Sequence, residues 1–143
     1  NSIPFIGVIY LPAKKWLYYG SSAGAFKKVD GIIQKLPIFD GRDHLVVVGS
    51  RSHHSVETSE YFDSLKKKHG EIEIVSMGSS LKICLVAEGK ADLYPRFAPT
   101  MEWDTAAGHA ILNSVGKNLI DFKTKRPMEY NRINLINNWF IVK

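Results

Sequence analysis

The stretch that decides the fold runs from Leu45-Val46-Val47-Val48 through a helix-like segment at 55–69 to Glu73-Ile74-Val75-Ser76. A continuous apolar run such as the first is typical of a strand buried on both faces of a sheet, which requires helices to cover it. Ser55 or Thr58 is the expected N-cap of the intervening helix. Strand, helix and strand in this order predict a layered α/β sandwich around a mixed sheet flanked by helices.

The flanking sequence predicts further elements of the same unit. Strands are expected over 3–10 and 16–20, joined as a hairpin by Pro12-Ala13-Lys14-Lys15. The polar stretch that follows, up to residue 44, is punctuated by Pro and Gly and carries no predicted element. Beyond residue 76 the pattern predicts helices over 79–88 and 104–115 and strands over 91–94, 119–122 and 139–142. We expect one globular unit over residues 1–143.

Composition narrows the class of protein. The chain has 143 residues, 45% hydrophobic and 23% charged, which is enough to bury one core. No apolar run is long enough to span a bilayer, so no transmembrane segment is expected. A net charge of +5 suits nucleic acid, an anionic membrane face or a phosphorylated small molecule, and charge alone does not choose among them. The single cysteine, Cys84, favours a reducing compartment.

A carboxylate stands at a predicted helix start in Glu102-Trp103-Asp104-Thr105-Ala106-Ala107-Gly108. The free N–H groups of a helix N-terminus favour anions, and a carboxylate can bind Mg²⁺, so Asp104 and the helix could hold a metal–phosphate complex. An ordinary N-cap is the other interpretation of Asp104. The small residues after it allow a ligand or another backbone to come close.

The segment Gly78-Ser79-Ser80-Leu81-Lys82 has the composition of a phosphate cradle. Ser79 is the expected cap of the helix that follows, and Lys82 lies three residues further on, over the same face. Ser79 and Lys82 would then hold one anion. Ordinary capping with an exposed lysine is the alternative.

Asp92, Tyr94 and Arg96 are spaced by two, so they share one face of an extended segment. Arg96 could bind a phosphate through two parallel hydrogen bonds, and Tyr94 could contact a ribose or a base. A surface ion pair between Asp92 and Arg96 explains the same spacing without a ligand.

Arg51-Ser52-His53-His54-Ser55 follows the predicted buried strand directly, where open α/β sheets place their ligands. Ser52 and His53 are therefore candidate phosphate donors. A zinc site is poorly supported, because adjacent histidines cannot share a helix face and the chain has no second cysteine.

Trp103-Asp104-x-Ala106-Ala107-Gly108 resembles the C-terminal metal-binding motif of the lithium-sensitive, magnesium-dependent phosphomonoesterases related to inositol monophosphatase. Within that superfamily, three segments are most similar to the bacterial CysQ-type bisphosphate nucleotidases: 76–82, 86–97 and 99–103. The resemblance extends from Gly7 to Phe140 and implies the C-terminal half of the inositol-monophosphatase-like fold.

The resemblance implies a catalytic role for Asp104 as a ligand of Mg²⁺. It also implies substrate-binding roles for six further residues: Ser52, His53, Ser79, Lys82, Tyr94 and Arg96. The family's Glu-Glu pair and its Asp-Pro-(Ile/Leu)-Asp-Gly-Thr loop belong to the N-terminal half, and neither occurs in these residues. We therefore expect a fragment that is inactive alone and whose partner is its own N-terminal half.

The implied activity is Mg²⁺-dependent removal of the 3'-phosphate of adenosine 3',5'-bisphosphate, giving AMP and phosphate and recycling a by-product of sulfate assimilation. The implied partner is a small nucleotide bisphosphate, with no nucleic acid, and a homodimer is a further expectation. The expected location is the cytoplasm, or the periphery of the inner membrane on its cytoplasmic side. Two rival functions stay open: a phosphatase of inositol phosphates, and a non-catalytic module that binds nucleotides or nucleic acid.

Overall fold

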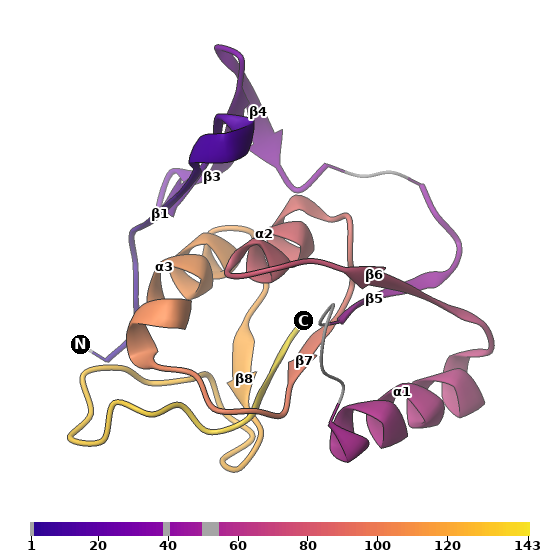
Figure 1. Ribbon diagram of the computed structural model, residues 1–143. Helices are drawn as coiled ribbons and strands as arrows, with labels where there is room; N and C mark the ends of the chain where they lie inside the picture. Colours follow the sequence, from indigo (N-terminus) through magenta and orange to yellow (C-terminus); the bar gives the residue numbers. More distant parts are fainter. Residues whose placement is uncertain (1, 39–40, 50–54) are drawn as a thin grey trace.

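The computed structural model describes residues 2–38, 41–49 and 55–143. Four layers are stacked: a four-stranded antiparallel sheet, the helices α2 and α3, a mixed sheet, and the helix α1 (Figure 1). The elements in chain order are β1 (Gly7–Leu11), the 3-10 helix η1 (Pro12–Lys14), β2 (Trp16–Ser21), β3 (Gly24–Val29), β4 (Ile32–Leu36), β5 (Leu45–Gly49), α1 (Val56–His69), β6 (Ile72–Ser76), α2 (Leu81–Glu88), β7 (Tyr94–Arg96), α3 (Glu102–Asn113), β8 (Leu119–Asp121) and β9 (Phe140–Val142).

The mixed sheet forms as predicted. Strands β5 and β6 run parallel, and β9 pairs antiparallel with both β7 and β8. A parallel bridge between Val47 and Leu93, with the Val48 N–H donating to the Leu93 carbonyl at 2.7 Å, joins the two parts in the order β6-β5-β7-β9-β8. Phe62 and Leu65 of α1 pack on Val47 from one face, and α2 covers the other face. The predicted layered α/β class is confirmed.

The stretch without predicted elements contains two strands, β3 and β4, so that prediction was wrong. They form a hairpin in which Val29 pairs with Ile32 around Asp30 and Gly31. Both turn residues have positive φ, 47° and 85°, as the two-residue type I' turn requires. The Asp-Gly pair was therefore a hairpin signal.

Most other expected elements are present with shifted ends. Helix α1 is confirmed, with the Thr58 N–H donating to the Ser55 hydroxyl at 3.3 Å. Strand β1 begins at Gly7 rather than at residue 3, and the short strand expected over 91–94 lies at Tyr94–Arg96. Helix α2 begins at Leu81 and α3 at Glu102, so the expected starts at 79 and 104 are wrong by two residues each.

Small residues let α3 lie directly on the four-stranded sheet. Gly7 of β1 is paired with Gly20 of β2 on the face toward α3. A Cβ atom on Gly7 would lie 2.1 Å from the carbonyl oxygen of Ala107, which leaves no room for a side chain. On another side of α3, a Cβ on Gly108 would lie 2.9 Å from the Ile83 side chain of α2. The small residues after Asp104 thus let α3 pack closely against β1 and against α2.

A buried ion pair fastens the four-stranded sheet to α2. Lys27 Nζ of β3 lies 2.8 Å from Glu88 Oε1, and the Tyr18 hydroxyl donates to Glu88 Oε2 at 2.8 Å. Lys90 Nζ reaches Oε1 from the solvent side at 3.0 Å. Burial alone would raise the pKa of Glu88, but the hydrogen bonds from Lys27, Lys90 and Tyr18 hold it below its ordinary value.

Among the described residues, no helix combines the length and the hydropathy needed to cross a membrane.

Candidate functional site

The predicted site residues of the second half of the chain meet at one cavity. It has a volume of about 250 Å³ and lies between the N-terminal ends of α2 and α3 and the strand β7. Its lining comprises Ser79, Ser80, Lys82, Ile83, Tyr94, Arg96, Thr100, Asp104, Thr105 and Phe140. Ser52 and His53, the other two predicted residues, lie outside the described part of the chain.

Lys82 is a buried cation, so the alternative of an exposed lysine is wrong. It stands in the first turn of α2 with only 8% of its surface exposed. Its ammonium group donates to the Met77 carbonyl at 3.3 Å and lies 5.4 Å from the centre of the Tyr94 ring. Burial, and then the charge of Arg96, lower the pKa of Lys82. A desolvated ammonium group, which has three N–H donors, favours binding of an anion.

Arg96 does not form the ion pair with Asp92 that the spacing allowed. Asp92 instead binds Arg42 at 2.9 Å and accepts the Val46 N–H at 2.8 Å, so it fastens the start of β5. Nη2 of Arg96 makes a long contact, 3.5 Å, to the carbonyl of Pro99. Its Nε is buried and has no hydrogen-bond partner within the described residues. An unsatisfied buried donor costs about 1–3 kcal/mol. A phosphate oxygen would remove that cost.

Tyr94 forms part of the cavity wall. Its ring packs edge-on against Phe140 with centroids 5.9 Å apart, and burial raises the pKa of its hydroxyl to about 12. The phenol therefore stays protonated at neutral pH and can donate a hydrogen bond.

Met101 is the N-cap of α3, and Asp104 is the third residue of the helix. Asp104 therefore does not stand where the helix begins. Its Oδ2 accepts the Met101 N–H at 2.8 Å, and the side chain is exposed at the cavity. One oxygen is enough for this capping bond. The N-cap interpretation of Asp104 was therefore wrong, because Asp104 caps α3 from the third position of the helix. Its other oxygen stays available for a cation.

The cap of α2 is Ser80 and not Ser79, which corrects the expectation for that helix. The Ser80 hydroxyl donates to the Asp104 carbonyl at 3.2 Å and so links the first turns of the two helices. Ser79 precedes it with a positive φ of 53°, a left-handed conformation that costs a serine free energy. Such strain at a cavity rim is typical of functional sites.

Sequence reasoning missed three hydroxyl residues of the lining: Ser80, Thr100 and Thr105. Ser80 and Thr105 directly follow residues that were predicted, so adjacency was an available signal. Thr100 lies in the segment 99–103 that carried the family resemblance, but its place at the cavity depends on the tertiary fold.

The described residues supply one carboxylate for a metal. They contain no group of three or more His, Cys, Asp or Glu side chains that could hold a metal ion. Mg²⁺ is commonly held by one or two carboxylates together with waters and substrate phosphates. Asp104 fits as one such ligand and cannot form a site alone.

His109, which lies on the same helix as Asp104, is a structural residue. It is fully buried, with Nδ1 at 3.1 Å from the Tyr130 hydroxyl and Nε2 at 2.7 Å from Asn118 Oδ1. Burial lowers its pKa, although the hydrogen bond with Asn118 acts in the opposite direction.

Comparisons with known proteins identify the family of the chain. The family profile described as the inositol monophosphatase family matches residues 1–139. The 3'(2'),5'-bisphosphate nucleotidase CysQ of Salmonella typhimurium is 45% identical over 139 residues, which are 97% of this chain and 54% of the relative. The CysQ of Escherichia coli is 44% identical over 140 residues, with the same shares of the two chains.

Solved structures give the same result for the fold. The crystal structure of CysQ from Bacteroides thetaiotaomicron superimposes with a TM-score of 0.94 at 49% identity, covering all of this chain and 59% of that one. Inositol monophosphatase II of Staphylococcus aureus superimposes with a TM-score of 0.71 at 20% identity, covering 99% of this chain and 53% of that one, and it shows the fold alone. The chain spans about half the length of the curated relatives it matches. It belongs to the inositol monophosphatase family.

Proposed function

We propose that the protein containing this chain is a Mg²⁺-dependent phosphomonoesterase that removes the 3'-phosphate of adenosine 3',5'-bisphosphate, giving AMP and phosphate. The observation that carries the proposal is a cavity that sets one exposed carboxylate, Asp104, opposite two cations, Lys82 and Arg96. The identity of 44–49% to CysQ relatives favours this substrate over others of the family. Because the chain covers only part of those relatives, the activity is proposed for the whole protein.

Each residue of the cavity has a role in the proposal. Asp104 would hold a Mg²⁺ ion together with carboxylates outside these residues. When bound, Mg²⁺ polarises a phosphoryl group and lowers the pKa of a coordinated water. The ammonium of Lys82 and the unsatisfied Nε of Arg96 bind a phosphate of the substrate. The Ser79 hydroxyl and Tyr94 line the same cavity and donate to that phosphate or to the ribose. Ser52 and His53, which follow β5 in the sequence, stay proposed donors.

The number of cations supports a bisphosphate. If the reacting phosphate lies at Asp104, Lys82 and Arg96 are left for a second anionic group, which an inositol monophosphate does not have. Lys82→Met and Arg96→Met should therefore raise KM for adenosine 3',5'-bisphosphate by about tenfold or more, since a hydrogen bond to a charged group contributes about 1.5–3 kcal/mol. The same variants should leave the slower hydrolysis of inositol 1-phosphate almost unchanged.

A substrate panel tests the proposal against its rivals. The panel compares phosphate release from adenosine 3',5'-bisphosphate, AMP and inositol 1-phosphate at equal concentration. Preference for inositol 1-phosphate would replace the proposed substrate. No hydrolysis, combined with salt-dependent binding of oligonucleotides, would favour the binding module instead.

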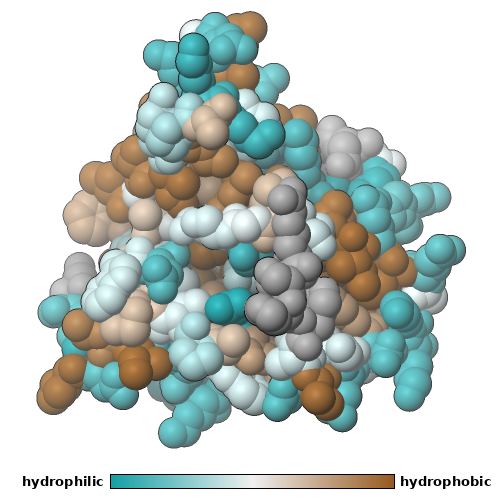
Figure 2. Space-filling model, viewed as in Figure 1, coloured by the Kyte–Doolittle hydropathy of each residue, from teal (hydrophilic) through white to brown (hydrophobic). Residues whose placement is uncertain are grey.

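We further propose that a part of the protein outside these residues covers the outer face of the four-stranded sheet. Val8, Tyr10 and Ile33 are more than half exposed on that face, and Tyr19 and Phe26 stack there with ring centroids 5.3 Å apart. Figure 2 shows apolar side chains gathered over β1 and its surroundings. An uncovered apolar sheet face of this kind normally marks an interface.

The matched relatives are almost twice as long as this chain, so the remaining polypeptide is the occupant that we propose. Light scattering tests it. The 143-residue chain should form oligomers or aggregates, because its apolar sheet face is open. The longer protein, in which that face is covered, should not associate through it. If the longer protein dimerises through β1–β4, a second copy is the occupant.

A further inference from the structure

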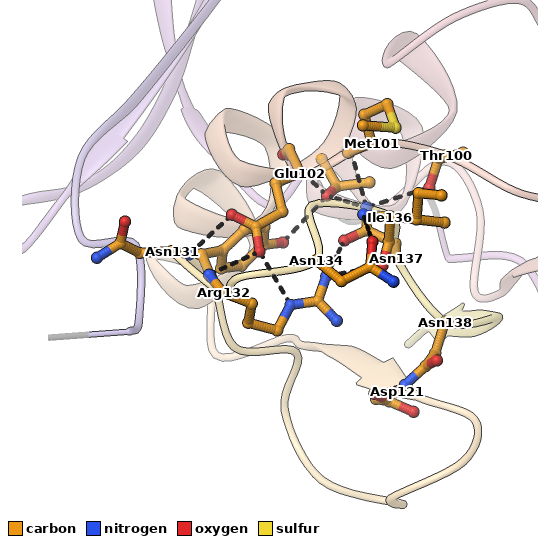
Figure 3. A network of polar contacts seen from close by, with 12 residues as sticks. Thr100, Met101, Glu102, Asp121, Asn131, Arg132, Asn134, Ile136, Asn137 and Asn138 are labelled. Atoms are coloured by element: carbon orange, nitrogen blue, oxygen red, sulfur yellow. Dashed lines mark hydrogen bonds and ion pairs between the residues drawn. The ribbon is translucent and has the colours of Figure 1, made fainter.

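The segment 130–138, which we name the C-terminal strap, lies across the start of α3. It is bonded to that turn by two backbone hydrogen bonds: the Glu102 N–H donates to the Leu135 carbonyl at 3.0 Å, and the Asn137 N–H donates to the Thr100 carbonyl at 2.8 Å. Together they form the antiparallel bridge between Met101 and Ile136. Two side chains of the strap, Arg132 and Asn137, point into the same turn (Figure 3). The strap therefore fixes the residues that precede and follow the N-cap of α3.

Asn137 holds three parts of the turn at once. Its Nδ2 lies 3.1 Å from Thr100 Oγ1, 2.9 Å from the Met101 carbonyl and 3.0 Å from Thr105 Oγ1, and the side chain is almost fully buried. Its Oδ1 accepts from Arg132 Nη2 at 2.8 Å. Because the guanidinium of Arg132 can only donate, the amide oxygen faces Arg132 and the amide nitrogen faces the turn.

Arg132 closes the network on the other side of the turn. Its Nε donates to Glu102 Oε1 at 2.9 Å, while its Nη2 reaches Asn137. Figure 3 shows the guanidinium of Arg132 between Glu102 and Asn137. The Glu102 carboxylate also accepts the backbone N–H groups of Asn131 at 2.7 Å and of Arg132 at 3.2 Å.

We infer that Asn137, fixed by Arg132, is a positioning residue that orients the Asp104 carboxylate for Mg²⁺. Met101 connects Asn137 to Asp104. Its carbonyl accepts a hydrogen bond from Asn137, and its N–H donates one to Asp104 Oδ2. A shift of Met101 therefore moves the carboxylate. Neither Asn137 nor Arg132 lines the cavity, so neither touches the substrate. The inference rests on the proposed function, in which Asp104 is a metal ligand.

The test is the affinity of the whole protein for Mn²⁺, used as a paramagnetic substitute for Mg²⁺ and measured by the free-ion signal in electron paramagnetic resonance. Asn137→Ala removes the amide and should weaken Mn²⁺ binding by about 10- to 100-fold, the usual loss when a group that orients a metal ligand is removed. KM for the nucleotide, measured at saturating metal, should stay within about twofold of the wild-type value.

Asn138→Ala is the matched control. Asn138 is the next residue of the strap, and its amide donates to Asp121 of β8 at 2.8 Å instead of to α3. Its removal should leave Mn²⁺ affinity unchanged even where it lowers the melting temperature as much as Asn137→Ala does. If Asn137→Ala does not fold, Arg132→Lys keeps a positive charge beside Glu102 but lacks the planar group that also holds Asn137, and it should weaken Mn²⁺ binding in the same direction.

The outcomes separate the two claims. Equal Mn²⁺ affinities in Asn137→Ala, Asn138→Ala and the wild type would overturn the positioning role and leave the proposed function intact. A wild-type protein that binds no Mn²⁺ and hydrolyses no bisphosphate would overturn both. A loss confined to Asn137→Ala and Arg132→Lys supports the inference.

Discussion

Lys27→Met should destabilise the protein, because the Glu88 carboxylate would stay buried without this cation. In the wild type, Lys27 Nζ lies 2.8 Å from Glu88 Oε1, and the two side chains are 5% and 1% exposed. Lys27 Nζ also lies 3.9 Å from the centre of the Trp16 ring. Methionine keeps most of the side-chain volume and removes the charge. The variant therefore isolates the electrostatic contribution of the pair from the packing of β3 on α2.

The magnitude follows from the surroundings of Glu88. Breaking a buried ion pair by removing one partner costs about 3–5 kcal/mol, because a charge stays buried without compensation. Two donors remain to Glu88, the Tyr18 hydroxyl at 2.8 Å and Lys90 Nζ at 3.0 Å. Lys90 is half exposed and screened by solvent, so it compensates only in part. We therefore expect the lower end of the range, about 3 kcal/mol.

Urea denaturation at pH 7 measures the change, with Lys67→Met as the control. Lys67 lies in α1, away from the four-stranded sheet, and is exposed. Its replacement should change the free energy of unfolding by less than about 0.5 kcal/mol. The double variant Lys27→Met, Glu88→Leu removes both charges and should recover most of the lost stability. If Lys27→Met costs no more than Lys67→Met, the buried pair does not fasten the sheet to α2 and our account of that contact is wrong.

Three further predictions concern stability. The pKa of Glu88 is lowered in the fold, so its contribution is fully present above its unfolded pKa, about 4.3. That contribution is lost as pH falls further, and Glu88→Gln should flatten the acid limb of a plot of unfolding free energy against pH. Gly7→Ala places a Cβ 2.1 Å from the Ala107 carbonyl oxygen and should cost at least about 1–3 kcal/mol in urea denaturation, whereas Gly78→Ala, with open space around it, should cost little. Ser79→Gly relieves the positive φ of 53° and should leave the melting temperature equal or higher while it raises KM for the bisphosphate, and a lower melting temperature would contradict the assigned strain.

Much of the architecture follows from local sequence. The apolar run of β5, the Ser55 cap of α1 and the alternation of strands and helices were readable, because burial on both faces and capping leave direct compositional signals. Strands β3 and β4 were not predicted, because Lys27, Lys28 and Lys35 hide their alternation. Lys27 is a polar residue that points inward, and only its distant partner Glu88 makes that position acceptable.

The site, too, was predicted only in part. Spacing and resemblance together named Ser79, Lys82, Tyr94, Arg96 and Asp104, and the fold brings all five to one cavity. Their environments were not predictable, because the burial of Lys82 and the unsatisfied Nε of Arg96 depend on tertiary packing. The strap was missed as well. Asn137 and Arg132 are ordinary polar residues in sequence and acquire a role only where the chain returns to α3.

Phosphate release from adenosine 3',5'-bisphosphate, with and without Mg²⁺, tests the central claim most directly when the wild type is compared with Asp104→Asn in the whole protein. Asparagine can still accept the Met101 N–H through its amide oxygen, so the cap of α3 is kept while the charge for a metal is removed. We predict Mg²⁺-dependent release by the wild type and a loss of at least about 100-fold in Asp104→Asn, with little change in melting temperature. Equal rates in the two proteins, or release that does not depend on Mg²⁺, would contradict the account.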